Sequence, residues 1–170
     1  MPTTYEPIAT QTLSSATSSV TFSAIASTYT DLIVVCNNLF VASGTPNLRV
    51  QFNSDTGANY SVTVLEDFQN TVYSRRQSSI TGIDYGYYNY IYPTSTSTAP
   101  NSAIIQIMNY SNTTTNKTAI ARVNNTYSGP ITGVGLWRNT SAITSVTVTN
   151  SSYVNFTVGS IFTLYGIKAA

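Results

Sequence analysis

Charged side chains are scarce in this chain, and histidine is absent. Lysine, arginine, aspartate and glutamate make up 8% of the 170 residues, against roughly 25% in ordinary soluble proteins. Without histidine there is no Ser-His-Asp triad, no Cys-His pair and no imidazole ligand for a metal. The formal net charge of +1 argues against nucleic-acid binding, which needs an excess of lysine and arginine to displace counterions from phosphates. We therefore expect no histidine-based catalysis and no nucleic-acid partner.

Cysteine and long apolar runs are also scarce. Cys36 is the only cysteine, which excludes an intrachain disulfide and a metal site built from paired cysteines. Because Cys36 ends an apolar run, we expect its side chain to be buried as a small hydrophobic group and not to act as a reactive thiol. That run, 32–36, is the longest in the chain and has five residues, far fewer than the roughly 18 of a membrane helix. No membrane partner is predicted.

The first residues of the chain and its overall composition suggest different locations for the protein. Residues 1–6 contain neither the basic nor the apolar region of a secretory signal, so none is predicted. Yet serine, threonine and asparagine supply 66 of the 170 residues, as in many extracellular proteins. The eight Asn-x-Ser/Thr sequons follow from that composition, and we do not interpret them as glycan sites. A virion protein, assembled in the host cytoplasm and released by lysis, would reconcile the two observations.

The residues that are abundant suit β-strands. Hydrophobic residues make up 42% and aromatic residues 12% of the chain, which argues against disorder. Apolar and polar residues alternate most clearly in 47–53, where Arg49 and Gln51 separate three apolar side chains. Segment 31–36 is apolar at both parities, which predicts a strand covered on both faces. Windows with helical periodicity are nearly absent.

These patterns predict an all-β chain that forms a single domain over residues 1–170. The expected strands are 5–12, 19–23, 31–36, 47–53, 60–65, 71–75, 102–108, 118–123, 131–137, 143–148 and 160–165. Many short strands between polar turns indicate a β-sandwich, and we favour a jelly-roll-like one with about 8–11 strands and almost no helix. An immunoglobulin-like sandwich is the alternative, but its Cys…Trp…Cys framework is lacking. The longest irregular stretch is a tyrosine-rich excursion over 84–101.

A search for catalytic or ligand-binding motifs gives only weak candidates. The adjacent Glu66 and Asp67 would point to opposite faces of a strand, so they do not form a glycosidase pair. Asp55 or Asp84 could meet another carboxylate only through the fold. Segment 53–57 spaces oxygen ligands as calcium loops do, but with one acidic residue it is better interpreted as a polar turn. No nucleotide motif follows Gly133. We predict no enzymatic activity, no cofactor and no metal.

The tyrosine cluster is the one unusual feature. Tyrosine offers a large contact area with few torsions to freeze, which suits a binding surface. Packing of the loop onto its own domain, contact with a protein and contact with a glycan all remain open. Two neighbouring basic residues could pair with carboxylates of a partner. The predicted contact residues are Tyr85, Tyr87, Tyr88, Tyr90, Tyr92, Arg75 and Arg76.

Several segments carry a resemblance to a known group of proteins. They are IATQTL (8–13), VTFS (20–23), YTDL (29–32), LRVQFN (48–53), NYS (59–61) and the ending FTLYGIKA (162–169). With these, the chain resembles small virion structural proteins of tailed bacteriophages. The match covers both ends and the first third of the chain, is most specific at the ending, and is weakest over 66–101. The resemblance implies a decoration, cement or tail-associated component, and it carries over no catalytic residue.

Together, composition and resemblance predict a capsid decoration (cement) protein. Such a protein would form a homotrimer, dock on the major capsid protein or other virion proteins, and stabilise the shell by mass action. The alternative is a tail-fibre or spike tip that recognises the host by binding a surface glycan. A third hypothesis, a polysaccharide-cleaving enzyme, would depend on Asp55 or Asp84.

Overall fold

The computed structural model describes residues 4–68, 70–86, 98–125 and 129–168, and over these ranges the chain forms strands and no helix. None of the described segments is therefore a helix that could cross a membrane. The strands are β1 (Tyr5–Thr12), β2 (Val20–Phe22), β3 (Asp31–Leu39), β4 (Leu48–Phe52), β5 (Tyr60–Phe68), β6 (Thr71–Ile80), β7 (Ile83–Tyr85), β8 (Asn101–Met108), β9 (Lys117–Asn125), β10 (Gly129–Trp137), β11 (Val146–Asn150) and β12 (Ile161–Ile167).

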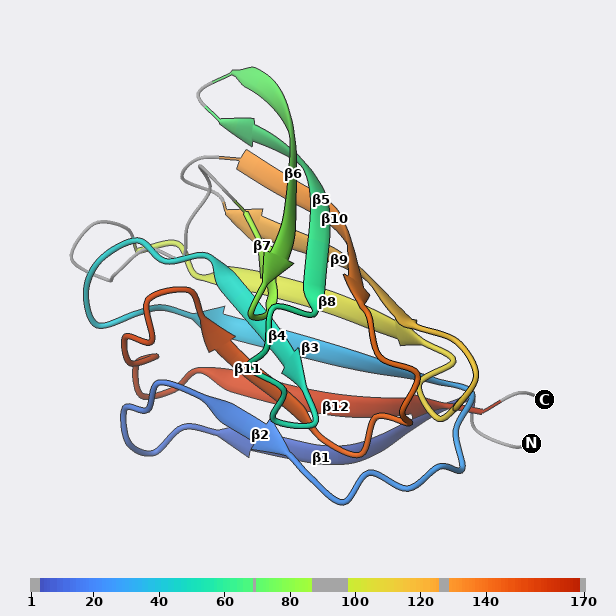
Figure 1. Cartoon of the computed structure of the whole chain (residues 1–170). Helices are drawn as coiled ribbons and strands as arrows, with labels where there is room; N and C mark the ends of the chain where they lie inside the picture. Colours follow the sequence, from blue (N-terminus) through green and yellow to red (C-terminus); the bar gives the residue numbers. More distant parts are fainter. Residues whose placement is uncertain (1–3, 69, 87–97, 126–128, 169–170) are drawn as a thin grey trace.

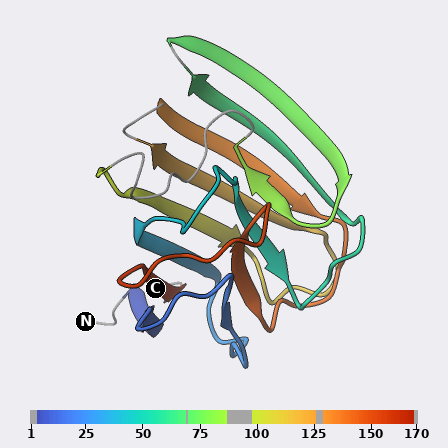
Figure 2. The same cartoon turned by 90° about the vertical axis from the view of Figure 1, so that its left-hand side faces the viewer.

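These strands form two antiparallel sheets that pack as two layers (Figure 1). The larger sheet has eight strands in the order β1-β12-β3-β8-β9-β10-β5-β6, and the smaller has four in the order β2-β11-β4-β7. Figure 2 shows the larger sheet running from the blue β1 at one end to the green β6 at the other. The predicted all-β sandwich is confirmed.

The strand pairing is that of a jelly roll. Four antiparallel pairs, β1 with β12, β2 with β11, β3 with β8 and β4 with β7, are the successive pairs of one long hairpin. Alternate pairs go to alternate sheets, which gives the half-sheets β1-β12-β3-β8 and β2-β11-β4-β7. Winding one hairpin over two sheets in this way produces the eight-stranded jelly roll.

Two inserted hairpins account for the remaining four strands. The hairpin β5–β6 follows β4, and the hairpin β9–β10 follows β8; β10 pairs with β5 and β9 pairs with β8. Together they lengthen the larger sheet and leave the smaller one at four strands. The twelve strands exceed the predicted number by one, because β7 lies partly within the stretch predicted to be irregular. Its three residues are too few for alternation to reveal a strand.

The core lies between the sheets and is built from the alternate residues that face inward. The buried ring of Trp137 on β10 stacks on that of Tyr60 on β5, with 6.2 Å between centroids, and also contacts Phe52. Gly135 faces the same layer, where a Cβ atom would lie 2.5 Å from the Cγ2 of Ile83 on β7. The absence of a side chain at this position lets the smaller sheet approach the larger one closely.

Candidate functional site

The structure corrects the predicted role of one of the tyrosines. Tyr85 ends β7, is completely buried, and its hydroxyl donates to the carbonyl oxygen of Ala119 at 3.4 Å. This burial raises the pKa of Tyr85 far above its usual range. Partner contact by Tyr85 was therefore a wrong prediction, because β7 joins the smaller sheet and brings this side chain into the core. Tyr87, Tyr88, Tyr90 and Tyr92 lie outside the described residues.

The two arginines predicted to join that cluster do not form one basic patch. Arg75 and Arg76 are consecutive on β6, so they point to opposite faces of the sheet. Arg75 is half-buried, and its guanidinium lies 5.5 Å from the centroid of the Tyr73 ring. Arg76 is exposed and stands opposite Thr63 of β5. Of the two, Arg76 is the one that the described structure leaves at the surface.

Asp55 holds the turn between β4 and β5 together. Its Oδ2 accepts a hydrogen bond from the indole N–H of Trp137 at 2.7 Å, and its Oδ1 accepts one from the backbone N–H of Gly57 at 2.8 Å. Asn59 donates to the same carboxylate, and the Tyr60 hydroxyl donates to the Asp55 carbonyl oxygen. This carboxylate ties the surface turn to the aromatic core, which agrees with a polar turn over 53–57.

Acid should weaken this turn. Burial on its own would raise the pKa of Asp55, but hydrogen bonds from Trp137, Asn59 and Gly57 outweigh it and lower the pKa below its ordinary value of 3.8. A carboxyl group with a lowered folded-state pKa contributes stability above its unfolded-state pKa and loses it as the pH falls through the folded-state pKa. We expect the free energy of unfolding to fall below about pH 4, and to fall less in Asp55→Asn.

Urea unfolding between neutral and acidic pH would measure this effect. Trp137→Phe is the matched variant, since it keeps an aromatic ring and removes one donor to Asp55. In Trp137→Phe, the unfolding free energy should still fall at acidic pH, but by less than in the wild type. Equal pH dependence in the wild type and Asp55→Asn would show that this carboxylate does not couple folding to protons.

The other carboxylates examined as catalytic candidates also have definite surroundings. Asp84 on β7 forms a bidentate pair with Arg49 on β4. Glu66 is buried and Asp67 lies on the opposite face of β5, as their adjacency predicted. Within the described ranges there is no group of three or more acidic, cysteine or histidine side chains that could hold a metal ion. Cys36 is buried, as expected, and its burial raises the pKa of the thiol to about 12.

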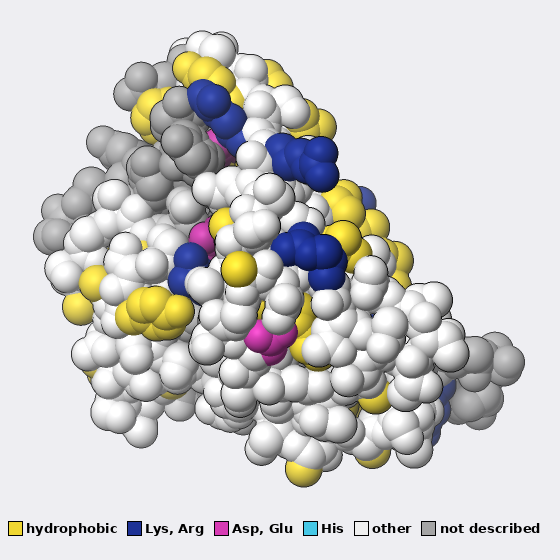
Figure 3. All heavy atoms as spheres, viewed as in Figure 1, with side chains coloured by type: hydrophobic (Ala, Val, Ile, Leu, Met, Phe, Trp, Pro, Cys, Tyr) yellow, Lys and Arg dark blue, Asp and Glu magenta, His cyan; other side chains and the backbone are white. Residues whose placement is uncertain are grey.

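A broad apolar surface is the feature that sequence reasoning missed. We call it the outer face: the face of the eight-stranded sheet that is turned away from the smaller sheet. Among the described residues, eight large hydrophobic side chains are exposed, and six of them belong to this face by their strand register. They are Tyr5, Leu65, Val72, Ile104, Ile120 and Val134. Hydrophobic side chains also line the upper right margin of Figure 3.

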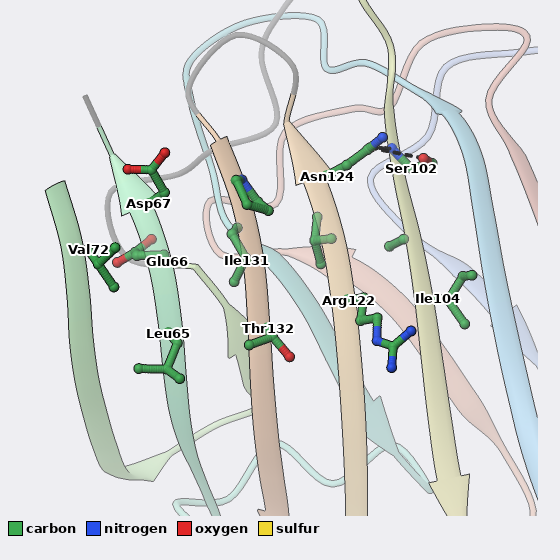
Figure 4. A pocket seen from close by; sticks show the side chains of 13 residues that line it. Leu65, Glu66, Asp67, Val72, Ser102, Ile104, Arg122, Asn124, Ile131 and Thr132 are labelled. Carbon is green, nitrogen blue, oxygen red and sulfur yellow. Dashed lines mark hydrogen bonds between the residues drawn. The ribbon is translucent and has the colours of Figure 1, made fainter. Parts of the chain in front are cut away.

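A hollow of about 660 Å³ opens on the outer face across β6, β5, β10, β9 and β8. Leu65 and Val72 stand at one side of it and Ile104 at the other, with Arg122 and Thr132 between them (Figure 4). The side-chain oxygen of Asn124 accepts hydrogen bonds from the backbone N–H and the hydroxyl of Ser102 at the hollow's upper end, which leaves this end polar. None of the described residues that line the hollow is aromatic, so it offers no platform for stacking a sugar ring.

No family model matches this chain, and no curated protein matches it. The solved structures similar to it include two variants of the alginate lyase Aly36B, in complex with an alginate tetrasaccharide and an alginate trisaccharide. The first is 9% identical and covers 84% of this chain and 72% of its own, with a TM-score of 0.32. The second is 8% identical and covers 91% and 73%, with a TM-score of 0.29. Similarities this weak carry no argument about activity.

Proposed function

We propose that this chain is a non-enzymatic structural protein of a bacteriophage virion, a capsid decoration protein that docks on the major capsid protein and stabilises the shell. The observation that carries the proposal is a jelly roll with a mostly neutral surface. The two candidate catalytic carboxylates both have structural roles: Asp55 stabilises a turn, and Asp84 forms an ion pair with Arg49.

The smaller sheet offers a surface of the kind that such docking needs. The view in Figure 3, from the side of this sheet, is mostly neutral with isolated charged side chains. On the sheet itself the hydroxyls of Thr21 and Thr147 hydrogen-bond to each other at 2.9 Å across β2 and β11. Neutral groups of this kind can be covered by a partner without the desolvation cost of unpaired charges. The smaller sheet is accordingly the surface we assign to the shell.

Copy number in purified virions tests the proposal. A shell component should be present in hundreds of copies per particle, and a tail component in tens or fewer. Quantitative mass spectrometry against the major capsid protein measures the ratio. Tens of copies, with density for this chain only on the tail, would contradict the decoration role and favour the host-recognition alternative.

Binding to shells that lack the protein gives a second, functional measurement. A ligand that binds only the assembled shell stabilises it by mass action. Added protein should therefore raise the temperature at which such shells disrupt, in a concentration-dependent manner. Shells that bind none of the added protein would contradict docking.

A further inference from the structure

We infer that the outer face of the eight-stranded sheet is the surface through which copies of this chain associate, so that the protein is a homo-oligomer. This inference goes beyond the proposed function, because it concerns the isolated chain and holds wherever in a virion the protein lies. The occupant of the face is a second copy of the same chain.

The exposed apolar residues of the outer face lie in neighbouring rows of adjacent strands, with Thr132 and Arg122 between some of them. Ile120 on β9 stands directly opposite Val134 on β10, and directly opposed residues of antiparallel strands share a face. Thr132 of the neighbouring row lies opposite Leu65 on β5, and Ile104 on β8 lies opposite Arg122. The exposed fractions of Leu65, Ile104, Ile120 and Val134 are between 39% and 52%. Single exposed hydrophobic residues are ordinary, but several gathered on one face of a sheet and rimmed by polar residues are typical of an interaction surface.

Strand β3 also carries apolar side chains on a face that the chain leaves partly exposed. Segment 31–36 on β3 is apolar at both parities, which predicted a strand covered on both faces. Leu32 and Val34 are indeed completely buried against the smaller sheet. Ile33 and Val35 point to the outer face and are only half-buried by their own neighbours. The sequence therefore supplies a second apolar face that the described part of the chain does not cover.

The size of the outer face matches what a stable association needs. The seven spacings between its eight strands, about 4.8 Å each, make the face about 34 Å wide, and strands about 25 Å long give it an area of about 840 Å². A standard interface buries about 800 Å² on each partner. A second copy can thus cover most of the outer face at once, whereas a peptide or a single loop would cover only part of it.

The charges of the outer face favour a copy of the chain over a partner of strong charge. By register, the charged residues that the strands place on it are Asp31, Asp67, Arg76 and Arg122, two of each sign. The face is therefore neutral overall. An excess of one sign would repel an identical face, whereas balanced charges permit self-association. Among the described residues no ion pair involves Arg76 or Arg122, so both guanidinium groups are available to carboxylates of a neighbouring copy.

Sedimentation equilibrium of the purified protein tests this inference. Wild-type protein should have a mass that is a multiple of the chain's 18.3 kDa. Val134→Asp places an unpaired charge among the exposed apolar residues of the face and should raise the dissociation constant by about 100-fold or more. Val158→Asp is the matched control: Val158 is 61% exposed, against 52% for Val134, and lies between β11 and β12, outside the strands that form this face. Its variant should assemble like the wild type.

A labelling experiment avoids any variant that carries a new charge. Cys36 is completely buried and its thiol pKa is raised to about 12, so it should stay silent toward a maleimide. The introduced thiol of Val134→Cys should react rapidly in dilute protein and slowly in concentrated protein, whereas that of Val158→Cys should react at one rate throughout.

The outcomes separate this inference from the virion proposal. Assembly that Val134→Asp abolishes and Val158→Asp preserves supports the inference. A wild-type mass of one chain from about 1 µM to about 100 µM, or a labelling rate of Val134→Cys that does not depend on concentration, overturns it. A monomer that still binds shells in hundreds of copies would overturn the inference alone and leave the decoration role standing.

Discussion

Replacing Asp84 with alanine should lower the free energy of unfolding by about 3–5 kcal/mol. The carboxylate is held by Arg49 in a bidentate pair, with 2.6 Å from Nε to Oδ1 and 2.8 Å from Nη2 to Oδ2. Only 11% of the Arg49 side chain and 8% of the Asp84 side chain are exposed. Alanine would leave the guanidinium charge largely desolvated and without its partner, which is the costly way to break an ion pair.

The position of this pair in the fold explains why its loss should affect global unfolding. Arg49 and Asp84 stand directly opposite each other on β4 and β7. The same guanidinium donates to the Tyr153 hydroxyl at 3.2 Å and lies 5.6 Å from the centroid of that ring. Hydrogen bonds to Asp84 raise the pKa of Arg49, although burial opposes this. Because a guanidinium group is not deprotonated in proteins, Arg49 would keep its charge after Asp84 is removed. One arginine joins two strands and the loop after β11.

Two control variants sharpen the prediction. The double variant Arg49→Met/Asp84→Leu removes both charges and should recover most of the lost stability, because a buried ion pair and apolar residues of similar volume contribute comparably. Glu6→Ala breaks the ion pair between Glu6 and Lys168, whose side chains are 30% and 43% exposed, respectively. Because solvent screens such an exposed pair, this variant should leave the unfolding midpoint unchanged. Urea unfolding followed by circular dichroism measures all three. A cost below about 1 kcal/mol for Asp84→Ala would show that water screens the pair.

Much of the fold could be predicted from the sequence, because a half-buried strand reveals itself through local alternation. Eleven strand segments were predicted, most of them from alternation and segment 31–36 from its run of apolar residues. The prediction failed at β7, whose three residues are too short to show a period and follow directly on a turn. It also could not assign β5 and β10 to one ladder. That pairing joins residues about 70 positions apart, and alternation carries no information about partners.

The candidate site was predicted less well, for a related reason. The tyrosines were interpreted by residue type, and residue type does not distinguish a contact residue from a core residue. Tyr85 is buried because its strand pairs with β4, which is a long-range event. The outer face, in contrast, left a local signal: Val134 and Ile120 are apolar at positions where the alternation calls for polar residues. Ile33 and Val35 are likewise apolar at outer-face positions. This pattern was interpreted as a strand buried on both faces, but the described residues fully bury only the inner face of β3.

Truncating Phe162 to alanine should cost about 3–5 kcal/mol of unfolding free energy. Phe162 is completely buried on β12, between Gln11 of β1 and Cys36 of β3 in the ladder. Its ring meets that of Phe156 edge to face, with 5.3 Å between centroids. Alanine would lose this contact and leave a cavity that the flanking strands, fixed by their hydrogen bonds, could fill only in part.

Two further variants test whether burial of Phe162 on β12 causes the loss of unfolding free energy. Leu164, also completely buried two residues along, should cost about 2–5 kcal/mol when changed to alanine. Val158→Ala removes apolar atoms from a side chain that is 61% exposed and should stay within about 0.5 kcal/mol of the wild type. If Phe162→Ala behaved like Val158→Ala, β12 would not lie in the core. The larger sheet would then lose the strand that joins β1 to β3, and with it the pairing that defines the jelly roll.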